Sequence, residues 1–94
     1  MNEVKIQSKS YSVKQVNKLI VLNHLMNTAH ELNGEWNPTP EDDKYYIYYS
    51  HFLKRLEVCW HNYINCGCVY FKSKELALKA IEIVGEKVLK MIYE

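Results

Sequence analysis

Residues 44–61 read KYYIYYSHFLKRLEVCWH and contain two runs of residues that favour β-strands. Tyrosine dominates the first run, residues 44–49, and apolar residues alternate with other types in the second run, residues 55–61. A third segment, residues 66–72, ends in the strand formers Val-Tyr-Phe before a lysine. Together these segments predict an antiparallel three-stranded meander over residues 44–72.

The register of the strands predicts which side chains face the core. Pairing Tyr49 with Lys54, and Leu56 with Phe71, places directly opposed residues on a common face. One face is apolar and should be covered by helices; it holds Tyr45, Ile47, Leu56, Val58, Trp60, Val69 and Phe71. The opposite face should have no helix over it; it carries Tyr46, Tyr48, Arg55, Glu57, Cys59, His61, Cys66, Cys68 and Tyr70. We expect a partner to bind on this side, through a surface made of Tyr46, Tyr48, Arg55, His61, Tyr70 and Lys72.

Residues 12–33 precede the strands and predict a helix of about six turns. Ser12 and Gln15 form a capping-box pattern, and apolar residues then recur every three or four positions until Asn33-Gly34. The apolar stripe is wider than one core contact needs, which indicates either deep burial or a second contact with another copy or a partner. The residues predicted to make that second contact are Leu19, Leu22, Leu25 and Met26.

The remaining segments complete a single α+β domain. Residues 34–43 contain two prolines and three consecutive acids, which is typical of a surface loop. Residues 73–93 predict a C-terminal helix that Ser73 caps, and Gly85 within it allows a bend or a restart. Residues 1–11 show no sustained period and form a lead-in. The predicted fold is a long N-terminal helix, a three-stranded antiparallel meander and a C-terminal helix packed on one sheet face.

Composition and charge exclude several classes of protein. The chain has 94 residues, 48% of them hydrophobic, which suits one folded domain rather than a disordered tail. Its formal charge of +1 provides neither the polybasic field that duplex DNA binding needs nor a polyanionic mimic of DNA. The apolar runs are too short for a membrane-spanning helix or a secretory signal. An odd count of three cysteines fits reduced thiols, so we expect a cytoplasmic protein with no membrane partner.

Four predicted positions on the uncovered face carry zinc-ligating residue types. Cys59, His61, Cys66 and Cys68 offer thiolates and imidazole. Four such positions on a sheet space their Cβ atoms by about 5 Å across strands and about 7 Å along them, which is too wide to close on one metal. We therefore predict no metal and no other cofactor.

Catalytic and nucleic-acid-binding motifs are also missing from the sequence. The four histidines are scattered, and none lies near a nucleophile in a recognisable motif. The glycines form no phosphate-binding loop. Residues 66–71 lack the basic residue and the glycine–aromatic alternation of sheets that stack RNA bases. We predict that the protein is not an enzyme and does not bind nucleic acid.

Three segments of the chain carry a recognisable pattern. Residues 31–38 read ELNGEWNP, residues 44–49 read KYYIYY, and residues 67–86 read GCVYFKSKELALKAIEIVGE. Together they resemble the C-terminal module of small uncharacterised phage and prophage proteins of Firmicutes. That module has an LNGxWxPxW stretch, a tyrosine-rich strand and a VYFKSxELAxKAIEIxGE ending, and Pro40 stands here at the position of its second Trp.

The resemblance implies an accessory protein of a phage or prophage that acts in the cytoplasm of the bacterial host. Small accessory phage proteins often counter host defence. The first hypothesis is a non-enzymatic module that binds a host protein or another copy of itself, either as a homo-oligomer or as an inhibitor of a host defence protein, as anti-CRISPR proteins are. The alternative is a homo-oligomer that sequesters a nucleotide-like defence signal between protomers. In that case Tyr46, Tyr48 or Tyr70 would stack on a base, and Arg55 or Lys72 would bind phosphate.

Overall fold

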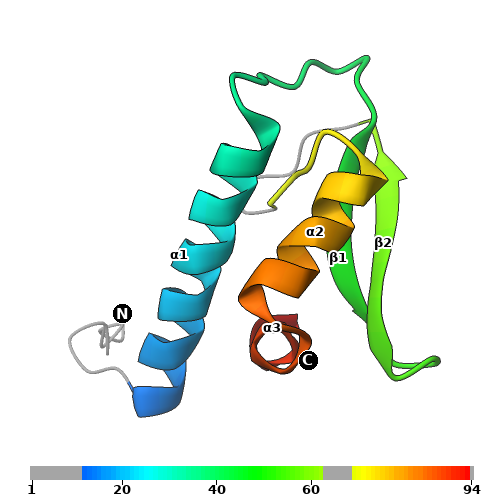
Figure 1. Cartoon of the computed structure of the whole chain (residues 1–94). Coiled ribbons are helices and arrows are strands. Elements are labelled where there is room, and N and C mark those ends of the chain that lie inside the picture. The colour runs from blue at the N-terminus through cyan, green and yellow to red at the C-terminus, as the bar shows by residue number, and fades with distance from the viewer. Residues whose placement is uncertain (1–11, 63–68, 94) are drawn as a thin grey trace, which may run out of the picture.

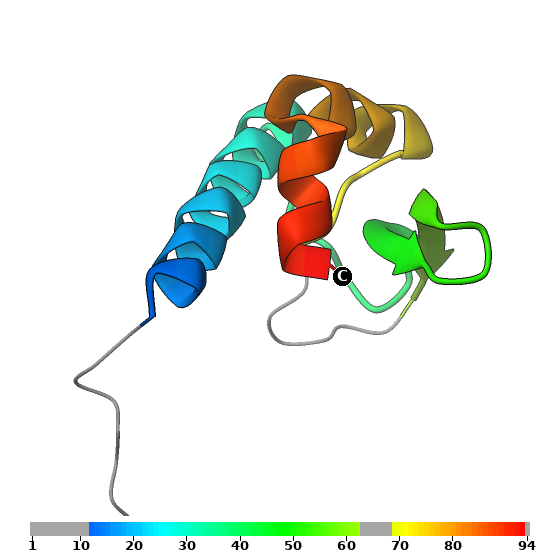
Figure 2. The same ribbon diagram turned by 90° about the horizontal axis from the view of Figure 1, so that it is seen from below.

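The computed structural model of the chain describes residues 12–62 and 69–93 and contains three helices and a two-stranded antiparallel sheet. In chain order the elements are α1 (Val13–Asn33), β1 (Lys44–Ser50), β2 (Arg55–His61), α2 (Lys74–Val84) and α3 (Glu86–Tyr93). Helix α2 lies between α1 and the hairpin of β1 and β2 (Figure 1). The helices lie on one side of the hairpin (Figure 2). The predicted α+β class and long N-terminal helix are confirmed, whereas the sheet is smaller than predicted.

Local sequence signals set both ends of α1. The Ser12 hydroxyl accepts a hydrogen bond from the Gln15 N–H (3.1 Å), and the Gln15 side chain accepts one from the Ser12 N–H (2.9 Å), as the capping-box pattern predicts. The helix ends at Asn33 because Gly34 has a φ of 66°, a conformation that glycine adopts without strain. Asn33 is therefore the last residue of α1, directly before the loop that leads to the hairpin.

The two strands pair in a register that differs by two residues from the predicted one. Tyr49 lies opposite Leu56, whereas the prediction paired it with Lys54. Lys54 has a φ of 56°, which residues in a strand ladder do not adopt, so it belongs to the turn. A shift of two residues keeps every side chain on its own face. The predicted division into a helix-facing and an uncovered face is therefore confirmed for β1 and β2, with one exception: Trp60, predicted on the helix-facing side, is 53% exposed because it lies near the end of β2, beyond the core.

The prediction of a three-stranded meander is wrong, because no third strand pairs with β2 in the part of the chain that the structure describes. Phe71, predicted opposite Leu56, instead forms two backbone hydrogen bonds with Tyr45 on the other edge of the hairpin (3.0 and 2.8 Å). This single antiparallel bridge keeps Phe71 on the helix-facing side, where it is fully buried. The predicted pairs that involve residues 63–68 lie outside the described residues.

Asn33 connects the end of α1 to the segment that follows the sheet. Its side-chain amide donates to the Tyr70 carbonyl (2.8 Å), and its side-chain carbonyl accepts from the Lys72 N–H (2.9 Å). Because Phe71 bonds to β1, its two neighbours point their backbone groups to the opposite edge, and Asn33 pairs with them as a strand would. Residues 70–72 therefore lie between β1 and the end of α1 and are hydrogen-bonded to both.

Replacing Asn33 with alanine is expected to lower the free energy of unfolding by about 2 kcal/mol, because two backbone groups lose their hydrogen-bond partners. Asn33 is 8% exposed, so water replaces these bonds poorly. Asn17 is exposed on the same helix, and Asn17→Ala is a matched control with an expected change within about 0.5 kcal/mol. Urea unfolding measures both variants, and equal midpoints would show that the Asn33 contacts do not contribute to stability.

The C-terminal helix predicted over residues 73–93 is two helices. Ser73 caps α2 as predicted, through its hydroxyl, which accepts a backbone N–H of the first turn (3.3 Å). Gly85 then takes a φ of 104° and ends α2, and α3 runs in a different direction (Figure 1). The apolar period changes phase at this point: Leu89 is fully buried, whereas Val88, which continues the period of α2, is 38% exposed.

The core lies where the helices meet the hairpin. Ala77 and Ala80 are fully buried on α2, and their small side chains let the neighbouring elements approach this helix closely. Leu25 is also fully buried, because α1 turns the side that carries it and Ala29 toward the core, so the prediction that Leu25 contacts a partner is wrong. The core consists of Leu25, Ala29, Ile47, Leu56, Phe71, Ala77, Ala80, Val84 and Leu89. Among the described residues, no helix combines the length and the apolar character needed to cross a membrane.

Candidate functional site

The side of the hairpin that no helix covers carries a cluster of aromatic rings. The centroid of the His61 ring lies 4.8 Å from that of Tyr46 and 5.3 Å from that of Tyr70, and the Tyr48 centroid lies 6.2 Å from that of Tyr46. These are the spacings of interacting aromatic side chains. Tyr48 is exposed and the other three are half-buried. We call Tyr46, Tyr48, His61 and Tyr70 the aromatic face; the sequence predicts all four as binding residues, and the structure brings them together.

A fully buried lysine closes one end of the hairpin beside the aromatic face. Lys44 lies opposite His61, and its ammonium donates to the carbonyl oxygens of Thr39 (2.5 Å), Asp42 (2.8 Å) and Asn62 (2.6 Å). These bonds use all three donors of the ammonium. They tie the loop before β1 to Asn62, the residue that directly follows His61.

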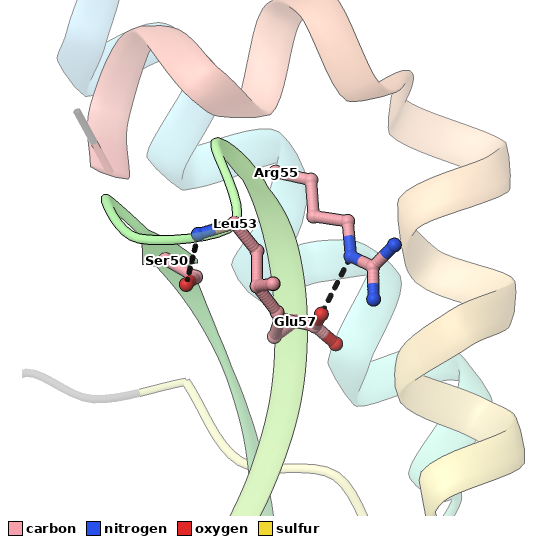
Figure 3. Close-up of polar contacts among 4 residues, drawn as sticks. All are labelled: Ser50, Leu53, Arg55 and Glu57. Carbon is pink, nitrogen blue, oxygen red and sulfur yellow. Dashed lines mark hydrogen bonds and ion pairs between the residues drawn. The ribbon is translucent and has the colours of Figure 1, made fainter.

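The two cations of the predicted binding surface lie at opposite ends of β1. Arg55 stands opposite Ser50, where its Nε donates to a carboxylate oxygen of Glu57 (2.6 Å; Figure 3). Lys72 is exposed and follows Phe71, which bridges to the first residues of β1. Six strand steps separate the two ends, or roughly 20 Å at 3.3 Å per residue. The two cations therefore do not converge on one anion.

The turn between the strands is held in shape by hydrogen bonds to Ser50. Its hydroxyl accepts from the Leu53 N–H (3.0 Å; Figure 3), and its carbonyl accepts from the Lys54 N–H (2.7 Å). The turn presents Phe52, which is 93% exposed, more than any other large apolar residue that the structure describes. Leu53 is 48% exposed beside it. We call residues 50–54 the hairpin tip.

Phe52 and Leu53 are absent from the predicted binding residues. The predicted register places them in the turn and assigns them no role. Turns are usually polar, so two adjacent apolar residues between two predicted strands are the signal that identifies the tip. On the uncovered side of the hairpin, Tyr48 is the member of the aromatic face nearest the tip, and Arg55 lies between Tyr48 and the tip.

A second apolar surface lies on α1. A groove of about 340 Å³ separates α1 from α3. It is lined by Lys18, Leu19, Leu22, Ile47, Val69, Ile92 and Tyr93. Of the helix residues predicted to bind a partner, Leu19 and Leu22 form part of the groove wall, and Met26 is 53% exposed outside it. Leu25 alone of these belongs to the core.

The described residues contain no group of three or more histidine, cysteine or acidic side chains that could hold a metal ion. Cys59 is a free thiol, exposed opposite Tyr46. Cys66 and Cys68 lie outside the described residues, so the four-residue zinc pattern cannot be built from the structure. The absence of a metal or cofactor stays a prediction.

The hairpin thus offers aromatic and apolar contact area, with its one exposed arginine already paired to a carboxylate. Comparison of the chain with protein-family models, curated proteins and solved structures finds no match.

Proposed function

We propose that the protein is a non-enzymatic accessory protein of a phage or prophage, which binds and inhibits a host defence protein in the bacterial cytoplasm. Protein binding rests on the hairpin tip, where Phe52 is 93% exposed on a turn that Ser50 holds in shape. Burial of a large aromatic side chain makes a large favourable contribution to the free energy of binding, and a turn that is already ordered loses little conformational entropy on binding. The phage origin and the defence target rest on the resemblance of residues 31–38, 44–49 and 67–86 to phage and prophage proteins.

The aromatic face extends the contact surface from the tip. Tyr48 and Arg55 adjoin the tip, and tyrosine and arginine are enriched among the residues that dominate binding energy at interfaces. The side chains of the Arg55–Glu57 pair are 62% and 27% exposed. Such an exposed pair contributes little to stability, so a partner can replace the Glu57 contact at small cost.

Protein binding is favoured over capture of a nucleotide because the cations are badly placed for phosphate. Arg55 is paired with Glu57, and Lys72 lies near the other end of β1. A phosphate group is normally held by several donors that converge on it. Arg55 and Lys72, the two cations predicted to bind phosphate, do not converge in this way.

Truncation of the tip, by Phe52→Ala together with Leu53→Ala, is expected to weaken binding to the defence protein by at least about 30-fold, the usual effect of removing an interface anchor. The test measures phage plating efficiency on bacterial strains that each carry one defence system. The wild-type chain is expected to raise plating in one strain, and the tip variant is expected to lose that effect. Leu78→Ala is the matched control, because Leu78 is 49% exposed on α2 and should protect as the wild type does.

The effector of that strain is then purified, and its affinity for the three chains is measured by calorimetry. The absorbance at 260 nm of the chain purified from bacteria tests the alternative function. Retained nucleotide would favour sequestration of a signal, and a tip variant that binds and protects like the wild type would contradict the assignment of the tip.

A further inference from the structure

Helix α1 is apolar on two opposite sides. One side, with Leu25 and Ala29, forms part of the core. On the other side Val13, Val16, Leu19 and Ile20 are 78%, 41%, 57% and 61% exposed, and we call these four residues the outward face. Exposed apolar residues that gather on one face of a helix often mark a contact with another molecule. The outward face is covered by nothing in the part of the chain that the structure describes.

Charge is missing from the outward face. Between residues 12 and 30 the only lysine, arginine or acidic residues are Lys14 and Lys18. Lys18 lines the groove toward α3, and Lys14 lies one turn before it on the same side of the helix. Asn23 and Asn27 continue the outward face and are uncharged, and the first charge on this side is Glu31, one turn beyond Asn27 near the end of the helix. A solvated helix face usually carries charges, whereas the centre of a protein interface is depleted of them.

We infer that the outward face of α1 is the interface of a two-fold symmetric dimer of this chain. Val16 and Ile20 lie one turn apart and form a ridge along the helix. When two such helices cross at this ridge, at an angle of roughly 50°, Val16 packs against Ile20 of the partner subunit and the contact repeats by symmetry. A face without charge meets an identical face without repulsion, so the surface is complementary to itself.

The outward face by itself provides only part of the apolar area that a stable interface buries. At the exposures given above, the four residues leave on the order of 300 Å² of apolar side chain in water. A stable interface buries about 800 Å² per partner, of which roughly 60% is apolar. Leu19 belongs to both the outward face and the groove, so the partner helix can extend its contact over Leu22 and Ile92. The dimer does not rest on the proposed function and leaves the hairpin tip uncovered.

Sedimentation equilibrium and native mass spectrometry of the full chain test the dimer. The expected mass is that of two chains of 11.2 kDa, with a dissociation constant in the micromolar range or below. Ile20→Lys is expected to weaken the dimer by at least about 30-fold, because it buries a charge in the interface. Lysine is a good helix former, so the helical content should not change. Ile83→Lys is the matched control on α2, where Ile83 is 49% exposed, and should leave the dimer intact.

A mixing experiment tests the two-fold contact itself. Val16→Glu and Ile20→Lys should each give a monomer alone and a heterodimer when mixed, because the new carboxylate of one chain then meets the new ammonium of the other. A wild-type chain that is monomeric at every concentration overturns the dimer. A dimer that survives Ile20→Lys, or that Ile83→Lys breaks, overturns the interface. Failure of the mixed variants to associate overturns the contact between Val16 and Ile20.

Discussion

Lys44→Met is expected to lower the free energy of unfolding by about 3 kcal/mol, although methionine keeps the length and apolar stem of lysine. Lys44 is fully buried, and its ammonium donates to the carbonyl oxygens of Thr39, Asp42 and Asn62. Methionine has no donor, so all three carbonyls lose their partner, and each unpaired group costs about 1–3 kcal/mol when water cannot reach it. The loop before β1 can open and let water reach these carbonyls, so the expected loss of stability lies toward the low end of the sum of the three costs.

Lys79→Met is the matched control for this change, because Lys79 is exposed on α2 and should change stability by no more than about 0.5 kcal/mol. Urea unfolding gives the comparison, with the slope of the transition checked to be equal in the two variants. If the two variants unfold at the same midpoint, the three bonds do not hold the end of the hairpin. Ring-proton shifts of His61 are a second readout, because Lys44 lies opposite that residue and binds the carbonyl of Asn62 next to it.

Phe71→Ala is expected to lower the free energy of unfolding by about 3–5 kcal/mol, the usual cost of removing a buried aromatic side chain and leaving a cavity. Phe71 is fully buried, and its backbone forms the bridge to Tyr45. The loss therefore removes packing at the point where the segment after the sheet joins β1. It should also loosen Tyr70, because the bridge between Phe71 and Tyr45 holds the neighbouring Tyr70 in the aromatic face.

Phe52→Ala is the natural comparison, because the chain contains two phenylalanines and Phe52 is 93% exposed. This change should alter stability by no more than about 0.5 kcal/mol. Thermal and urea unfolding of both variants measure the contrast. Similar losses in the two variants would mean that Phe52 packs against the protein, and the hairpin tip would then not be available to a partner.

Signals contained within a few residues predicted the local structure well. The capping box of Ser12 and Gln15 and the break at Gly34 bound α1 as the sequence indicates. Alternation along residues 44–49 and 55–61 assigned the two faces of the hairpin correctly even though the register was two residues off, because an even shift preserves the faces. It did not predict that Trp60, on the helix-facing side, is 53% exposed. The aromatic face was predictable for the same reason.

The errors concern contacts between distant segments. Residues 69–71 have the composition of a third strand, but composition does not determine which edge of the hairpin the segment joins. Asn33, which is 37 residues from Tyr70 along the chain, settles that choice through its side-chain hydrogen bonds. The exposure of Phe52 likewise depends on the absence of any described element over the tip, which a turn sequence does not reveal.

The sequence by itself determined the helix caps, the glycine breaks and the two faces of the hairpin, because each depends on backbone hydrogen bonds or alternation within a few neighbouring residues. Only the tertiary structure decided that Leu25 is in the core while Ile20, less than two turns away, is exposed. It also decided that the ammonium of Lys44 is enclosed by three carbonyls. Burial of this kind depends on which elements pack together, and an apolar period alone does not specify which side of a helix they will cover.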